Sequence, residues 1–259
     1  KNNKGEYVTS ALEYETIVLC GPNCDIDDLD TIALMDRLCD DLGVDTIETG
    51  ATIAVCMDGG KIPWGDANGA LGLIEEMMKG TDFGKLMGQG TKAVGEALGV
   101  KRIPCVKGQA MPAYDPRNLK GIGITYATSP MGADHTAGVT LMPGLVHKSK
   151  VGQVSLSQTM QTLSAVCDNN ICFFAYSGIL ADNSILPDLI AGVYGGEWNL
   201  GKAMDIGVQT IMLEKTFNNK AGFTEKDDVL PEFLYKDFSP ATGVEYDITP
   251  EEMAGVFKY

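Results

Sequence analysis

His135 is one of only two histidines in the 259-residue chain, and it follows an aspartate inside a run of small residues, "YATSPMGADHTAG". An imidazole titrates near neutral pH, so a histidine in such a place can accept and donate protons during catalysis. The alternative is structural, because a lone histidine is more often a satisfied core group or a surface side chain. Composition by itself favours the structural interpretation of His135, so a catalytic role needs support from other segments of the chain.

Seven cysteines form a second set of reactive side chains, at positions 20, 24, 39, 56, 105, 167 and 172. Their number is odd, and the first ten residues, "KNNKGEYVTS", lack the apolar core of a secretory signal. Thiols, metal ligands or core residues are therefore better interpretations than a disulfide framework, and a cytoplasmic location is expected. The chain also opens without methionine, which suggests a piece of something longer.

Apolar residues recur at three- and four-residue spacing along much of the chain, a pattern typical of helices. The pair Asp27-Asp28 and, further on, Asp66 can cap helix starts, while Gly43 and Gly80 stand at the corresponding ends. Thr249 begins a capping box with proline at the first helical position. The predicted helical stretches are 29–43, 67–80, 81–99, 117–129, 152–170, 199–218 and a last one after 249.

Only two segments resemble strands, "ETIVLC" (15–20) and "NICFFAY" (170–176), and each is short enough to be a buried helix instead. Residues 106–117 contain two prolines and several turn-forming residues, which makes them the best linker candidate. We therefore expect an all-α fold of two closely packed helical lobes, residues 1–105 and 106–259, with little or no sheet.

The overall charge restricts the partners. The formal charge of −15 disfavours nucleic acid, whose phosphates require clustered Lys and Arg, and it also disfavours anionic membrane surfaces. No run of eighteen apolar residues is present, so no bilayer span is expected. The 44% of hydrophobic and 21% of charged residues are ordinary for a globular protein.

Several segments taken together resemble one family, the C-terminal helical domains of tungsten-dependent aldehyde:ferredoxin oxidoreductases. The resemblance covers nearly the whole chain, through "ALEYETIVLCGPNCDIDDLDTIALMDRLCDDLGVDTIETG", "VKGQAMPAYDPRNLKGIGITYATSPMGADHTAG" and "EKTFNNKAGFTEKDDVLPEFL". It implies a tungsten (or molybdenum) bis-pterin centre, a [4Fe–4S] cluster, oxidation of an aldehyde to a carboxylate, and a ferredoxin-like electron carrier as partner.

The family carries a D-x-x-G-L-D/C motif twice, and each copy reaches toward one pterin. The first copy here is "DDLGVD", which implies pterin contacts from Asp40, Gly43, Val44 and Asp45. A helix that ends at Gly43 would present carboxylates and turn backbone groups, which suit the N–H edge of a pterin ring. Taken alone, the same segment is explained by a helix end followed by a surface aspartate.

The second copy, within "VCDNNICFF", is irregular. Cys172 stands where the family places a ligand to the [4Fe–4S] cluster, and Asp168 and Ile171 are assigned to the pterin. Asp168 lies one residue too close to Cys172, so either Cys167 replaces the motif aspartate or the turn is shorter; Asn170 stands where glycine is usual. The other three cluster cysteines of the family precede the "EYET" region, so Cys20 and Cys24, which follow it, are expected to be buried small hydrophobes.

The resemblance assigns proton chemistry to Glu15 and His135. A carboxylate among apolar neighbours has its charged form disfavoured, so it can hold a proton near neutrality; the alternative is a solvated position, which suits Glu13 better. The glycines and alanines around His135 would leave room for a cofactor and substrate. His147 matches nothing in the family and is expected at the surface.

The resemblance implies an N-terminal β-rich domain that supplies much of the pterin-binding surface, and we expect that domain to lie outside these 259 residues. We therefore expect the chain alone to be folded but inactive and free of cofactor, with that domain as its partner. No Glu-x-x-His motif is present, so the family's iron-linked dimer is not expected, and homo-oligomerisation by another mode stays open. The alternative function is a non-catalytic helical scaffold or subunit-contact domain derived from the family.

Overall fold

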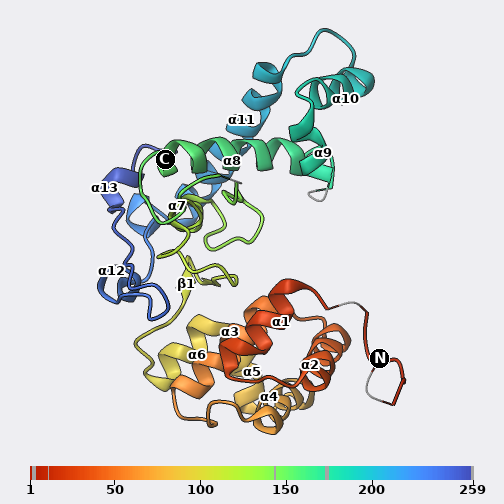
Figure 1. The fold of residues 1–259 in the computed structure, drawn as a ribbon, viewed down its shortest axis with the longest axis vertical. Coiled ribbons are helices and arrows are strands. Elements are labelled where there is room, and N and C mark those ends of the chain that lie inside the picture. The colour runs from red at the N-terminus through yellow and green to blue at the C-terminus, as the bar shows by residue number, and fades with distance from the viewer. Residues whose placement is uncertain (2–3, 11, 143, 173–174, 258–259) are drawn as a thin grey trace. The chain divides into compact units, whose positions relative to one another are not determined.

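The computed structural model describes residues 1, 4–10, 12–142, 144–172 and 175–257. Its regular structure is almost entirely helical (Figure 1), and among the described residues the only strands form one antiparallel hairpin, β1 (Cys105–Val106) and β2 (Gln109–Ala110). The predicted all-α fold is therefore confirmed. The chain divides into unit 1, Lys1–Tyr114, and unit 2, Asp115–Tyr259, a division that lies within the linker candidate 106–117.

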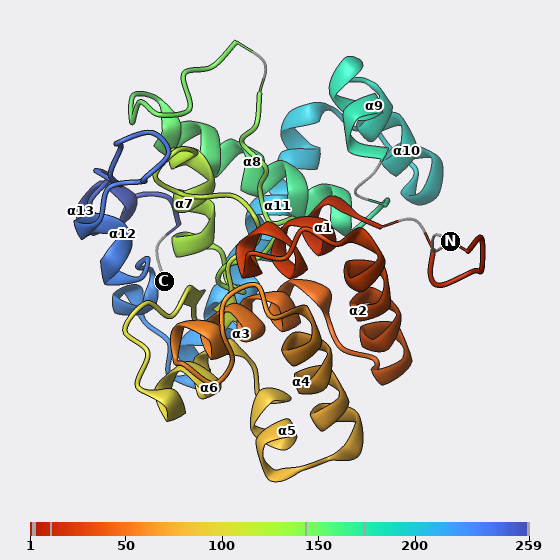
Figure 2. The ribbon, with the colours of Figure 1, turned by 60° about the horizontal axis from the view of Figure 1, so that its bottom comes forward.

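Unit 1 is built around one central helix, α3 (Thr46–Asp58), which packs against helices on several sides and against β2 (Figure 2). The helices around it are α1 (Tyr14–Cys20), a 3₁₀ turn (Pro22–Cys24), α2 (Leu29–Leu42), α4 (Ala67–Lys79), α5 (Asp82–Met87) and α6 (Thr91–Leu98). The segment "ETIVLC" is thus helical. Buried cysteines contribute to the core of unit 1, as predicted for Cys20 and Cys24, both of which are 0% exposed.

Side-chain caps fix where these helices begin. Asp28 accepts hydrogen bonds from the backbone nitrogens of the first turn of α2, and Asp66 accepts one from Gly69 N at the start of α4. Thr81 caps α5 in the same way. Each cap satisfies a backbone N–H that has no partner inside its helix, so the predicted starts of these three helices are confirmed.

Unit 2 is organised around α8 (Gln153–Asp168), which packs against α7 (Lys120–Thr128) on one side and α11 (Leu200–Ala221) on another (Figure 1). The remaining elements are α9 (Tyr176–Ala181), α10 (Ile185–Tyr194), a 3₁₀ turn (Glu225–Asp227), α12 (Glu232–Lys236) and α13 (Pro250–Met253). Part of the strand-like segment 170–176 lies outside the described residues, and its last residue begins α9. None of the described helices is both long and apolar enough to cross a membrane.

Every residue of α7 is buried, which explains its unusual glycines. A Cβ on Gly123 would lie 2.5 Å from the ring of Tyr246, so only glycine permits this close packing. Lys120, at the start of α7, is 1% exposed and pairs with Asp247. These contacts tie the C-terminal segment of the chain to the helix that leads into the His135 loop.

Candidate functional site

Glu15 lies inside unit 1, whereas Glu13 lies at its surface. Glu15 is 4% exposed, and among the described residues it is the only buried Asp or Glu. Its Oε2 accepts a hydrogen bond of 2.7 Å from the backbone nitrogen of Ala113, 98 positions further along the chain. As the sequence suggested, Glu13 and not Glu15 occupies the solvated position. The buried Glu15 carboxylate is fixed in place by a backbone donor.

Two tyrosines complete the surroundings of Glu15. The Tyr14 hydroxyl donates to the carbonyl oxygen of Ala113 at 3.2 Å, and the Tyr14 and Tyr114 rings lie 5.5 Å apart. Burial, followed by the negative charge of Glu15, raises the pKa of the Tyr114 hydroxyl above its usual value. The end of the linker segment is therefore held against the start of α1 by Tyr14 and Glu15 together, a contact that the sequence did not predict.

The first motif forms the turn between α2 and α3. Gly43 adopts a left-handed conformation, with φ of 76°, that ends α2, and its N–H donates to the Cys39 and Asp40 carbonyls. A Cβ built on Gly43 would meet no atom within 4 Å, so the turn faces open space. The Asp40 side chain is exposed and makes no hydrogen bond or ion pair with a described residue, which leaves its carboxylate available to a ligand with N–H donors.

Asp45 is exposed and also caps the N-terminus of α3. Its Oδ2 accepts a hydrogen bond of 2.7 Å from Glu48 N and so caps α3. Val44 and Asp45 both line a small pocket of about 180 Å³ in unit 1, with Glu48 beside them. The Glu48 carboxylate accepts from the backbone nitrogens of Thr91 (2.7 Å) and Ala110 (2.9 Å), so it joins α3 to α6 and β2.

The buried glutamate and the first motif are brought together by a pair of threonines. The hydroxyl groups of Thr16 and Thr46 lie 2.9 Å apart, which links α1 to the first residue of α3. Thr16 follows Glu15 and Thr46 follows Asp45. Two predicted site segments that are 30 positions apart in sequence are therefore adjacent in unit 1.

His135 lies half-buried in unit 2, in the loop that follows α7. Both ends of this loop are fixed: Asn218 Nδ2 of α11 donates to Pro130 O at 2.6 Å, and Thr125 Oγ1 of α7 donates to Gly138 O at 2.9 Å. Asp134 accepts from Thr136 N, forming a turn around His135. The predicted surface residue His147 is half-buried, and its carbonyl accepts from Lys120 N.

The second motif lies at the C-terminal end of α8. This helix ends at Asp168, whose side chain is exposed; Ile171 is half-buried and Cys172 is exposed. The other six cysteines are buried or half-buried. Among the described residues, no group of three or more His, Cys, Asp or Glu side chains is arranged to hold a metal ion. Cys172 is thus accessible to a cluster whose other ligands would have to come from elsewhere.

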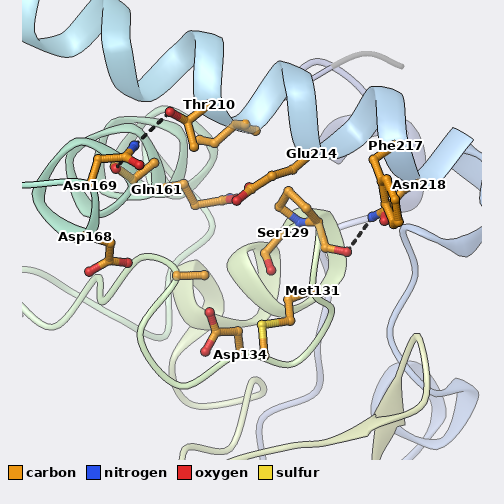
Figure 3. A pocket seen from close by; sticks show the side chains of 14 residues that line it. Ser129, Met131, Asp134, Gln161, Asp168, Asn169, Thr210, Glu214, Phe217 and Asn218 are labelled. Atoms are coloured by element: carbon orange, nitrogen blue, oxygen red, sulfur yellow. Dashed lines mark hydrogen bonds between the residues drawn. The ribbon is translucent and has the colours of Figure 1, made fainter.

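An open pocket of about 410 Å³ lies beside the second motif, between the His135 loop, α8 and α11 (Figure 3). It contains Asp168 together with two acids that the sequence reasoning did not select, Asp134 and Glu214. Partial burial, followed by the charge of Asp134, raises the pKa of Asp168. Partial burial and then the charges of Asp134 and Asp168 raise the pKa of Glu214.

The chain is similar in sequence to proteins of one known family. A family model described as "Aldehyde ferredoxin oxidoreductase, domains 2 & 3" matches residues 1–256. The tungsten-containing aldehyde ferredoxin oxidoreductase of Pyrococcus furiosus is 29% identical over 257 residues, 90% of this chain and 42% of the relative. That of Thermococcus kodakarensis is 30% identical over 258 residues, with the same coverage. The WOR-like subunit of an aliphatic sulfonate oxidoreductase from Pyrococcus furiosus is 27% identical over 155 residues, 52% of this chain and 25% of the relative.

The chain spans about two fifths of the length of the tungsten-containing relatives that it matches. The match to the family model, in contrast, is continuous and extends over almost every residue of both units. The chain therefore belongs to the aldehyde ferredoxin oxidoreductase family, in the region that the family model describes as domains 2 and 3.

Proposed function

We propose that this chain is the helical part of a tungsten- or molybdenum-dependent oxidoreductase that converts an aldehyde to a carboxylate and passes the electrons to a ferredoxin-like carrier. The observation that carries the proposal is the burial of Glu15: the only buried acid among the described residues is the one to which the sequence resemblance assigns proton transfer. Relatives whose names include tungsten and aldehyde ferredoxin oxidoreductase support the choice of cofactor and substrate class.

The first motif fits a pterin. A pterin ring presents N–H donors along one edge, and Asp40 offers an exposed carboxylate without a partner among the described residues, next to open space at Gly43. Asp45 has one oxygen occupied by the cap of α3, which leaves Oδ1 as an acceptor. Asp40, Gly43, Val44 and Asp45 would hold one pterin, and Asp168 and Ile171 of the second motif are proposed for the other.

Cys172 would supply one thiolate to a [4Fe–4S] cluster, which needs four ligands. Its exposure fits this role, while the remaining cysteines are buried or half-buried within their units. The other three thiolates would come from the part of the complete protein that precedes the "EYET" region, and further contacts to the pterins would come from an N-terminal β-rich domain. A cytoplasmic location belongs to the same proposal.

The proposed reaction requires groups that move protons. Oxidation of an aldehyde to a carboxylate consumes one water and releases two electrons and three protons. The metal centre supplies the two-electron oxidation when it is bound. Glu15, whose carboxylate is held in position by Ala113 N, would accept a proton from the attacking water. His135 would hold or release a second proton, from a loop fixed at both ends.

Activity of the complete protein, purified without oxygen, tests these roles. Glu15→Gln and His135→Asn should each lower kcat for aldehyde oxidation by about 10²–10⁴-fold, the usual contribution of a general acid or base. The matched controls are Glu13→Gln, two residues from Glu15 but exposed, and His147→Asn. Both controls should retain activity. Full activity in Glu15→Gln would remove the proposed role of the buried acid.

A non-catalytic scaffold or subunit-contact domain is the second candidate. The irregular second motif favours it, because Asp168 lies among other acidic side chains and Asn170 replaces the usual glycine. The two candidates differ in metal content: the scaffold would fold completely without tungsten, molybdenum or iron.

A further inference from the structure

The pocket of about 410 Å³ in unit 2 is lined by hydrogen-bond acceptors and by a few apolar side chains. Figure 3 shows its residues converging from the loop after α7, the C-terminal half of α8 and the C-terminal half of α11. None of the described residues that line it is Lys, Arg or His. Its volume is within the range of small-molecule sites, about 300–1,000 Å³.

Three carboxylates from three different elements face this one space: Asp134 of the loop, Asp168 of α8 and Glu214 of α11. The carboxylates of Asp168 and Glu214 form no hydrogen bond or ion pair with any described residue. Each instead lies in the field of its acidic neighbours, which disfavours its charged form. A cation placed among the three would remove this repulsion.

Gln161 provides an independent sign of a ligand. Its side chain lines the pocket although the residue is only 1% exposed. The amide nitrogen is occupied, since it donates to Thr128 Oγ1 at 2.8 Å and to Ser157 Oγ at 3.1 Å. Its Oε1 is a buried acceptor without a partner among the described residues. Such groups are rare in folded proteins because they lose the hydrogen bonds that water provides, so a ligand with an N–H donor would complete this site.

Apolar side chains at the rim define the rest of the ligand. Met131 and Phe217 line the pocket and are 60% and 72% exposed. Large apolar side chains at the edge of a pocket provide contact area for an apolar ligand body, and an aromatic ring also attracts a cation near its face. A metal ion is a poorer match, because no described group of three acidic, thiol or imidazole side chains has a metal-binding arrangement.

We propose that this pocket binds a primary ammonium group carried on a small apolar body. The ammonium would lie among Asp134, Asp168 and Glu214 and donate to Gln161 Oε1, while the apolar part would contact Met131 and Phe217. This site goes beyond the proposed redox function, because its occupant is neither the metal centre nor the aldehyde. It shares Asp168 with the proposed second pterin site, so its test uses the 259-residue chain without cofactor.

The test uses three probes of similar size that differ in charge: benzylammonium, benzyl alcohol and benzoate. Each is titrated into the 259-residue chain at neutral pH and low salt, with the methyl signal of Met131 followed by NMR and assigned from Met131→Leu. Benzylammonium should shift this signal in a saturable way and bind at least fivefold more tightly than benzyl alcohol, and benzoate should not bind. Added salt should weaken the binding, as expected for an attraction between charges.

Variants then locate the charge effect. Asp168→Asn and Glu214→Gln should each weaken benzylammonium binding about fivefold, which corresponds to about 1 kcal/mol. Asp205→Asn is the matched control, because it removes one negative charge from an exposed position of α11 that does not line the pocket. Equal binding of benzylammonium and benzyl alcohol, an unshifted Met131 signal, or equal losses in Glu214→Gln and Asp205→Asn would each overturn the proposal.

Discussion

The hydroxyl groups of Thr16 and Thr46 lie 2.9 Å apart and join α1 to the start of α3. Each threonine directly follows a residue with a proposed role, Glu15 in one case and Asp45 in the other. A buried acid and the turn that we propose to contact a pterin are therefore held in a fixed relation within unit 1. Because Thr16 is 3% exposed whereas Thr46 is half-buried, loss of the Thr46 hydroxyl leaves the Thr16 hydroxyl without this partner in the interior.

Thr46→Val should lower the free energy of unfolding by about 1–2 kcal/mol, since the buried Thr16 hydroxyl loses its partner; Thr16→Val should lower it by less, because the half-buried Thr46 hydroxyl can still bind water. The double variant should lose less than the sum of the single losses, because no unpaired hydroxyl remains. Urea unfolding of the three variants and the original chain measures this coupling. Additive losses would show that the two hydroxyls do not depend on one another.

Glu15 should protect the Ala113 amide from hydrogen exchange. Glu15→Ala removes the acceptor of the 2.7 Å hydrogen bond, so exchange at Ala113 N should accelerate and the fold should lose about 1–3 kcal/mol. Glu15→Gln keeps an acceptor oxygen and should keep most of the protection. Glu13→Ala, at an exposed position, is the control. Unchanged exchange in Glu15→Ala would mean that the carboxylate does not hold the linker segment.

Cys172 should be the cysteine that reacts first with a thiol reagent. Burial raises the pKa of Cys24, Cys56 and Cys105 to about 12 and that of Cys39 and Cys167 to about 11. The thiolate is the reactive form, and Cys172 is exposed. At pH 8 an aromatic disulfide reagent should label about one thiol per native chain and none in Cys172→Ser. Rapid labelling of several thiols in the folded chain would contradict the described burial.

Removal of the Glu214 charge should stabilise the chain at neutral pH. The folded state raises the pKa of this acid through burial and the charges of Asp134 and Asp168, so it binds the proton more tightly than the unfolded state does. The charged carboxylate therefore costs stability above its folded pKa, and this cost disappears as the pH falls toward the ordinary value of 4.5. Glu214→Gln should raise Tm at pH 7 but not near pH 4.5, with Asp205→Asn as control. A Tm increase that is the same at both pH values would contradict this origin.

Local signals in the sequence predicted much of the fold. Asp28, Asp66 and Thr81 cap helices where expected, and Gly43 ends α2 in the conformation that glycine adopts most easily. The central helix α3 was missed because eight of its residues are buried and its apolar positions do not follow one face. Its start did carry a signal, since Asp45 is followed three residues later by Glu48.

The surroundings of the candidate site could not be read from the sequence. Glu15 acquires its partner from Ala113, 98 positions away, through a contact that only tertiary packing creates. Glu214 lies in the middle of an ordinary helical pattern, and only the packing of α11 against α8 places it beside Asp168. The spacing of residues along the chain does not predict such long-range contacts, because they depend on how whole helices pack against one another.

Metal analysis of the complete protein that carries this chain, purified without oxygen, tests the proposed function most directly. We expect tungsten or molybdenum together with about four irons per chain, the content of one cubane cluster. Cys172→Ala should lower the iron content, whereas Cys105→Ala, which changes a half-buried cysteine, should not. A fully folded protein that contains neither tungsten nor molybdenum nor iron would contradict the proposed redox function and favour the scaffold.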